Sequence, residues 1–329
     1  MELLTKVTIP EPFQRLEHYH PVMFMGSCFA TSVGERFVKS KFPSVINPFG
    51  VIYNPYSVAS ALGFMISDDP LPESALIEHD GMWHSFYHHS IFSAETKEAC
   101  LQKTEEKRLR ASEFLKSAEC LFITFGTSWV FEHQQTGLVV SNCHKIPASQ
   151  FNRYRLNQEE IVAQYKDLLV KLNVFNPALK VVFTVSPVRH WKDGAHGNQL
   201  SKAVLLLAVE QLCEWFDSAS YFPSYELVMD ELRDYRFYAS DMLHMNDQTV
   251  EYIWQRFSDK WLSRDARQVV KKVEEIVKAV EHKPFNPNSE TYITFLENVL
   301  QKAHDLENHF PHLDFYAEKR ILNERLSQA

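Results

Sequence analysis

Short, almost wholly apolar segments alternate along this chain with longer segments of helical periodicity, and this alternation is what most constrains its fold. The clearest apolar segments are residues 22–25, 121–125 and 181–185. Strands buried on both faces have this composition, because neither face meets water. With amphipathic helices between them, the segments predict an α/β fold: a parallel sheet covered by helices on both sides.

The remaining predicted elements complete this pattern. Helices are predicted over residues 33–42, 57–66, 96–117, 157–172, 200–216 and 247–261. Asn157 and Glu160 have the spacing of a helix-capping pair. A hairpin is expected from residues 130–132 and 138–141, around a Gln-Thr-Gly turn, and a further strand near residues 225–229.

The character of the chain changes after about residue 263. Charged helical segments follow at 266–280, 289–303 and 316–326. We therefore expect an N-terminal arm (1–21), a main domain (22–262) and an α-helical C-terminal extension (263–329). The extension could pack on the core or join two copies in a homo-oligomer through its helices, and the sequence leaves both open.

Composition excludes several classes of function. The chain has 34 Lys+Arg against 42 Asp+Glu, a net charge of −8, and lacks the basic blocks of general nucleic-acid binders. Its nine glycines include no phosphate-binding cluster, so no nucleotide cofactor is expected. The longest apolar run, residues 203–209, is far shorter than the roughly 20 residues that cross a membrane. Five cysteines without a Cys-x-x-Cys pair, and a start without a signal-peptide pattern, predict a cytoplasmic protein.

The turn after the first strand carries the first candidate catalytic residue. In open parallel sheets, ligands bind beyond the carboxyl ends of the strands. Ser27 would stand there on a tight strand-to-helix turn, with its hydroxyl near a helix N-terminus. The alternative is that Ser27 only caps the helix. Cys28, beside it, is a second candidate nucleophile or a packing thiol.

Asp241 and His244 are three residues apart, before the last helix of the main domain. At this spacing the carboxylate can fix the imidazole tautomer and stabilise its protonated form. A purely local loop hydrogen bond is the alternative. With Ser27, the pair gives the order Ser, Asp, His, which provides a nucleophile, an orienting group and a base.

The chain resembles the GSCFA family, which is related to the SGNH (GDSL-like) hydrolases. The family motif stands here as residues 26–30. The resemblance extends over residues 22–258 through further ordered blocks: 47–50, 54–55, 125–129, 142–145, 186–190, 201–203, 221–226 and 241–244.

The resemblance implies a three-layer α/β/α flavodoxin-like sheet in which Ser27 is the nucleophile, His244 the base and Asp241 the residue that orients it. It also implies an oxyanion hole formed by the N–H groups of Ser27 and Gly50. Two departures stand out. The superfamily usually has an Asp between the glycine and the nucleophile, and an Asn after the glycine of the block at Gly126. Asn142 is the candidate to replace that Asn as the third donor.

Basic and polar side chains in the same blocks are candidate substrate contacts. Arg189 follows the third apolar strand, and arginine suits bidentate binding of an anionic group. The others are Thr127, His144, Lys145 and His190. Lys202, Arg233 and Arg236 extend the basic pattern. His79, His84, His88 and His89 are further histidines in this part of the chain. They lack Cys or carboxylate partners at the spacing of a metal site, so no metal is expected.

The sequence thus predicts a Ser-His-Asp esterase or acyltransferase without a cofactor, acting on a small-molecule or carbohydrate O-acyl ester such as an O-acetyl group. The alternative is a catalytically silent module of the same fold that binds an anionic ligand in an Arg/His-lined cleft.

Overall fold

Five parallel strands form the central sheet of the computed structural model, which describes residues 5–67 and 69–328. Their order is β10-β9-β5-β1-β2. The strands are β1 (Val22–Gly26), β2 (Ser44–Ile46), β5 (Cys120–Phe125), β9 (Lys180–Val185) and β10 (Ala219–Tyr221). All four pairings are parallel, with Val22 opposite Cys120 and Cys120 opposite Lys180. The three strands predicted from apolar runs are the three central ones.

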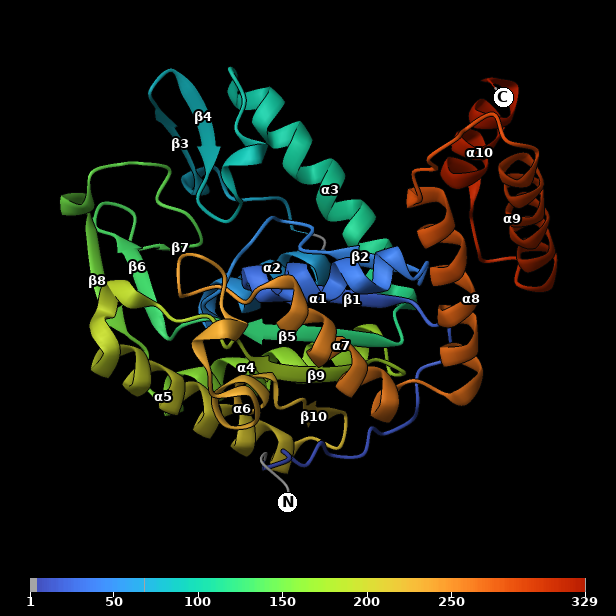
Figure 1. The fold of residues 1–329 in the computed structure, drawn as a ribbon. Helices are drawn as coiled ribbons and strands as arrows, with labels where there is room; N and C mark the ends of the chain where they lie inside the picture. The colour runs from blue at the N-terminus through green and yellow to red at the C-terminus, as the bar shows by residue number, and fades with distance from the viewer. Residues whose placement is uncertain (1–4, 68, 329) are drawn as a thin grey trace.

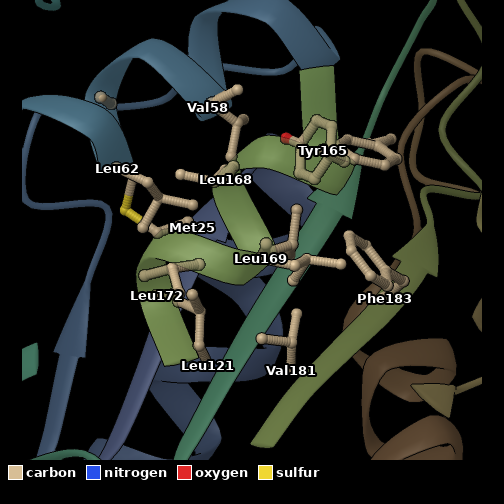
Figure 2. Close-up of a cluster of buried hydrophobic side chains, with 14 of the residues drawn as sticks. Met25, Val58, Leu62, Leu121, Tyr165, Leu168, Leu169, Leu172, Val181 and Phe183 are labelled. Carbon is tan, nitrogen blue, oxygen red and sulfur yellow. The ribbon is translucent and has the colours of Figure 1, made fainter. Parts of the chain in front are cut away.

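Helices cover both faces of this sheet, which confirms the predicted α/β/α layering (Figure 1). The long helices of the main domain are α1 (Cys28–Lys39), α2 (Pro55–Ile66), α3 (Lys97–Ser117), α4 (Gln158–Phe175), α5 (Gly194–Trp215) and α7 (Asp247–Trp261). Helices α1 and α7 cover one face, and α2 to α5 cover the other. Figure 2 shows part of the second layer, where Leu169 and Leu172 of α4 lie over Leu121 and Val181 of the sheet, and Leu168 lies beside Val58 of α2.

Side-chain caps start several of these helices. Asn157 and Glu160 form the predicted capping box at the start of α4. Asn54 and Asn246 accept from the backbone N–H groups of Ser57 and Thr249 at the starts of α2 and α7. Each cap satisfies an N–H that has no acceptor inside its helix, which fixes where the helix begins.

Two smaller sheets flank the central one. Strands β6 (Trp129–His133), β7 (Val139–Val140) and β8 (Phe151–Arg155) pair antiparallel in the order β7-β6-β8, and they stand beyond the carboxyl ends of the central strands (Figure 1). The hairpin predicted here is β6–β7. Strands β3 (Leu76–His79) and β4 (Met82–Ser85) form a separate hairpin. Single 3₁₀ turns occur at Glu73–Ala75, Ser90–Phe92, Ala148–Gln150, Trp191–Asp193 and Tyr235–Phe237.

The strand predicted near residues 225–229 is wrong. This segment is helical, with a short α6 (Ser224–Glu226) that continues into a π-helical turn, Leu227–Leu232. Leu227 and Val228 are buried against the face that α1 and α7 cover. The fifth strand is β10 instead, a three-residue edge strand with no apolar run to reveal it. Helices α1 and α5 also begin earlier than predicted, at Cys28 and Gly194.

Three further helices follow the main domain, as the sequence predicts: α8 (Arg264–Glu281), α9 (Glu290–His309) and α10 (Tyr316–Gln328). They share an apolar cluster of their own. Lys41, which follows α1, joins them to the main domain through an ion pair with Glu318 at 2.8 Å and by lying 5.3 Å from the ring centre of Phe315. They stand at the amino ends of the central strands, away from β6–β8 (Figure 1).

Within residues 5–67 and 69–328, no helix is both long enough and apolar enough to span a bilayer.

Candidate active site

The candidate residues gather where three neighbouring strands end. Strands β1, β5 and β9 lie side by side and run in the same direction, so the segments that follow them meet at one edge of the sheet. These segments begin at Ser27, Gly126 and Ser186. The loop before α7, residues 239–246, adds the fourth element of the site.

A glycine makes the first of these turns. Gly26 has a φ of +132°, and a Cβ atom there would lie 2.1 Å from the carbonyl oxygen of Thr124 on β5. The Gly26 N–H donates to Oδ1 of Asn47 at 2.8 Å, and Nδ2 of Asn47 donates to the Thr31 hydroxyl on α1 at 2.9 Å. The Asn47 side chain thereby links the Gly26 turn to α1 through two hydrogen bonds.

Ser27 occupies the N-cap position of α1, but its side chain does not cap the helix. Its residue is 3% exposed, and its hydroxyl oxygen is buried with no hydrogen-bond partner among the described residues. Its N–H donates to the Thr124 carbonyl at 3.1 Å, which extends the ladder between β1 and β5. Ser27 is thus the last residue held by the sheet.

Cys28 is the first residue of α1, and its side chain is partly exposed. The N–H groups of Cys28 and Phe29 have no backbone acceptor within the described part of the chain, as expected for a helix start. Burial raises the pKa of the Cys28 thiol, while these amides and the Lys202 charge oppose the rise.

Asp241 and His244 form the predicted pair. His244 Nδ1 lies 2.6 Å from Asp241 Oδ2, and the N–H groups of Leu243 and His244 both donate to Asp241 Oδ1 at 2.9 Å. The amide of His244, then its ring, then the amide of Leu243 lower the pKa of Asp241 to about 2. The carboxylate therefore stays charged at neutral pH and directs Nε2 of His244 away from itself.

The pair sits on a tight loop. The Ala239 N–H donates to the His244 carbonyl at 2.8 Å, and Met242 has a φ of +58°. The two side chains are about half exposed, His244 at 52% and Asp241 at 46%. The Asp241 charge acts on the Cys28 thiol, so the loop stands within electrostatic range of the turn after β1.

Arg189 braces this loop. Its guanidinium donates to the Met242 carbonyl and lies 5.1 Å from the ring centres of Trp191 and Tyr238. From the sequence, Arg189 is expected to bind an anionic group of the substrate. Here its hydrogen bond goes to the loop that carries Asp241 and His244, so the residue positions the pair, and anion binding stays a prediction.

Lys202 of α5 also lies at this edge of the sheet. It is 1% exposed, and its ammonium group donates to the carbonyls of Gly126 and Ser186, at 2.6 Å each. These carbonyls end β5 and β9. Burial lowers the pKa of Lys202 to about 7, and the charge of Cys28 opposes this.

Two of the three predicted oxyanion-hole donors are engaged elsewhere in the structure. The N–H of Ser27 is engaged by Thr124, and the N–H of Gly50 donates to the Asn47 carbonyl at 2.7 Å. The Asn142 amide donates to the Ser90 hydroxyl at 3.3 Å, and its Oδ1 accepts from the His144 N–H at 2.9 Å. The N–H groups of Ser27 and Gly50 are thus occupied by other parts of the chain, whereas the Asn142 amide uses one of its two N–H donors in the bond to Ser90.

The remaining predicted contacts are divided between the site and its surroundings. The His190 ring lies beside the end of β5, since a Cβ at Gly126 would lie 3.4 Å from its Nε2. Thr127 is buried and bonded to the Ser201 hydroxyl at 2.9 Å. His144 is buried, with Nε2 2.8 Å from the Ser85 carbonyl oxygen. Lys145, which follows it, is exposed.

Burial lowers the pKa values of His144 and His190 to about 4, so both rings are neutral at pH 7. Among the residues that the structure describes, no group of three or more His, Cys, Asp and Glu side chains is arranged to hold a metal ion.

Comparison with known proteins places the chain in a family. Residues 21–257 match the GSCFA family. The chain belongs to this family. Residues 273–328 match a second part of such proteins, described as "GSCFA domain protein, C-terminal domain". No curated protein matches the chain.

Among solved structures, a carbohydrate esterase family 3 protein from Talaromyces cellulolyticus is similar at 9% identity. The match covers 78% of this chain and 99% of the other, with a TM-score of 0.34. Similarity at this level carries no information about the reaction.

Sequence reasoning did not identify two residues that hold the site. Asn47 lies in the Asn-Pro-Phe-Gly block and fixes the Gly26 turn. In the sequence Lys202 is only one member of a basic pattern. In the fold it is a buried cation that donates to the carbonyls at the ends of β5 and β9. A lysine inside an otherwise apolar helix face was the signal available for it.

Proposed function

We propose that this GSCFA protein is an esterase or acyltransferase of SGNH type that acts on O-acyl esters. The observation that carries the proposal is the Asp241–His244 pair, held at 2.6 Å on the loop that precedes α7. A carboxylate bound to Nδ1 leaves Nε2 of the imidazole as the basic nitrogen, which is what a general base needs.

The reaction would run through an acyl-enzyme. A side chain of the Ser27–Cys28 turn attacks the ester carbonyl while His244 takes its proton. The tetrahedral intermediate collapses, and His244 returns the proton to the leaving alcohol. Water, or a hydroxyl of an acceptor, then repeats the steps in reverse. The family resemblance assigns the attack to Ser27, with Cys28 as the alternative.

The substrate class is the less constrained part of the proposal. Carbohydrate O-acetyl esters are the first candidates, by analogy with the superfamily that the family resembles.

Turnover of p-nitrophenyl acetate and of an acetylated sugar by the purified full chain tests the proposal. We expect His244→Ala to lower kcat/KM by about 10²–10⁴, the usual contribution of a general base. His304→Ala is the matched control, since His304 is an exposed histidine on α9. Absence of turnover by the wild-type chain, with no acyl or fluorophosphonate adduct, would refute the esterase and favour the binding module.

A further inference from the structure

The turn between β1 and α1 offers two adjacent nucleophiles, and the structure distinguishes them. We propose that Cys28, not Ser27, is the attacking residue, and that Lys202 is the buried cation that positions and stabilises its thiolate. This inference rests on the proposed function and names the residue through which the acyl-enzyme forms.

The backbone places Cys28 where a nucleophile is needed. Ser27 is still part of the sheet, because its N–H pairs with the Thr124 carbonyl. Its hydroxyl is enclosed and makes no hydrogen bond to any described residue. Cys28 is one residue further on, at the first position of a twelve-residue helix, and is partly exposed.

The same position supplies the oxyanion donors that Ser27 and Gly50 do not. The amides of Cys28 and Phe29 lack backbone acceptors among the residues described, and they oppose the burial that raises the pKa of the Cys28 thiol. N–H groups at a helix start favour negative charge, first on a thiolate and then on the oxygen of a tetrahedral intermediate formed beside it. Attack by Cys28 therefore develops its charge next to two available donors.

Lys202 gives a second, independent reason. Its buried ammonium is held by two backbone carbonyls, and no carboxylate among the described residues contacts it. A lysine carries three donors, so one N–H remains without an acceptor in the described part of the chain. A charge on Cys28 raises the pKa of Lys202, so a thiolate there and the ammonium favour each other. A buried cation is costly unless it meets a negative charge, and the thiolate that forms on Cys28 when His244 takes its proton would supply one.

The chemical steps balance without any further reagent. His244 removes the thiol proton, and the Cys28 sulfur forms a bond to the ester carbonyl carbon. The C–O bond to the alcohol breaks as His244 returns the proton to the alkoxide, which leaves a thioester on Cys28. Water then loses a proton to His244 and attacks the thioester, the C–S bond breaks, and the proton returns to the sulfur.

Two cysteine variants and one serine variant test the proposal with p-nitrophenyl acetate. We expect Cys28→Ala to lower kcat/KM at least about 10³-fold, and Ser27→Ala to retain at least ten times the activity of Cys28→Ala. Cys213→Ser is the control, since Cys213 is another partly exposed cysteine, on α5. Acid-quenched protein should carry the acetyl group on the Cys28 peptide, removable by neutral hydroxylamine as a thioester is.

Lys202→Met tests the role of the buried cation by a measurement that a structural role would not move. The charges acting on the Cys28 thiol are those of Lys202 and Asp241. Because the charge of the Cys28 thiolate raises the pKa of Lys202, the two charges favour each other, and removing Lys202 should shift the pH dependence of Cys28 alkylation by iodoacetamide upward, with an unchanged circular dichroism spectrum. An unchanged profile in a folded variant would overturn the assignment of Lys202.

The cysteine assignment and the esterase activity can be refuted separately. An acetyl group on Ser27, together with an active Cys28→Ala variant, would overturn the cysteine assignment and leave the esterase intact. No adduct and no turnover in the wild-type chain would refute the esterase and the cysteine mechanism with it.

Discussion

Replacing Gly26 with alanine should destabilise the whole central sheet. The new Cβ would lie 2.1 Å from the carbonyl oxygen of Thr124 and 2.9 Å from the carbon and nitrogen of the same residue, all of them backbone atoms of a neighbouring strand. Since backbone cannot rotate away as a flexible side chain can, β1 and β5 must separate locally.

The size of the effect follows from two contributions. A φ of +132° in a residue with a side chain costs about 1–3 kcal/mol. Separation of the strands also weakens the bond from the Ser27 N–H to Thr124, which contributes about 1 kcal/mol. We therefore expect Gly26→Ala to lower the free energy of unfolding by about 2–4 kcal/mol.

Gly63→Ala provides the matched control. Gly63 lies inside α2, and a Cβ there would have no atom within 4 Å among the residues described. Alanine is the better helix former, so this variant should gain about 0.5–1 kcal/mol. The two alanine variants should thus move the unfolding transition in opposite directions.

Urea unfolding, followed by circular dichroism at pH 7, measures both variants against the wild type. A Gly26→Ala variant whose free energy of unfolding stays within about 0.5 kcal/mol of the wild type would show that the turn does not depend on glycine. The geometric argument for the position of Ser27 and Cys28 would then be wrong as well.

Three further results are expected. Asp241→Asn should lower kcat by about 10²–10⁴ with an unchanged circular dichroism spectrum, because a neutral amide no longer fixes the His244 tautomer; wild-type kcat would contradict this. Arg189→Ala should lower kcat more than KM rises, because Arg189 holds the Met242 carbonyl rather than the substrate; a rise in KM alone would restore the anion-binding role. Finally, the urea midpoint should fall as the pH drops from about 6.5 to 4. Burial holds the pKa of His18 at about 4 in the folded protein, so the exposed ring of the unfolded chain binds its proton at a higher pH, and protonation favours unfolding. A midpoint independent of pH would refute this.

The parts of the fold that the sequence predicted are those where burial dictates composition. Strands β1, β5 and β9 are enclosed on both faces, so their residues had to be apolar. Strand β10 at the sheet edge and the β3–β4 hairpin lack that constraint, since they are short and partly exposed. Their sequences therefore lack the continuous apolar run that predicts a buried strand.

In the candidate site, contacts between residues close in sequence could be predicted, whereas contacts that depend on the folded sheet could not. A spacing of three predicted the Asp241–His244 pair, because the contact is local. Whether Ser27 or Cys28 faces the reaction depends on a hydrogen bond to β5, nearly a hundred residues away. The burial of Lys202 likewise depends on two strand ends that only the folded sheet brings together.

The order of the chain has a consequence for its synthesis. The candidate nucleophiles lie within the first 28 residues, whereas the proposed base lies on a loop that follows all five central strands. A nascent chain that ends at residue 240 has the whole central sheet but neither His244 nor α7, whose Trp254 and Phe257 cover one face of that sheet. The segment that closes the core therefore also delivers the base, so a growing polypeptide would have no hydrolytic capacity until its main domain is able to fold.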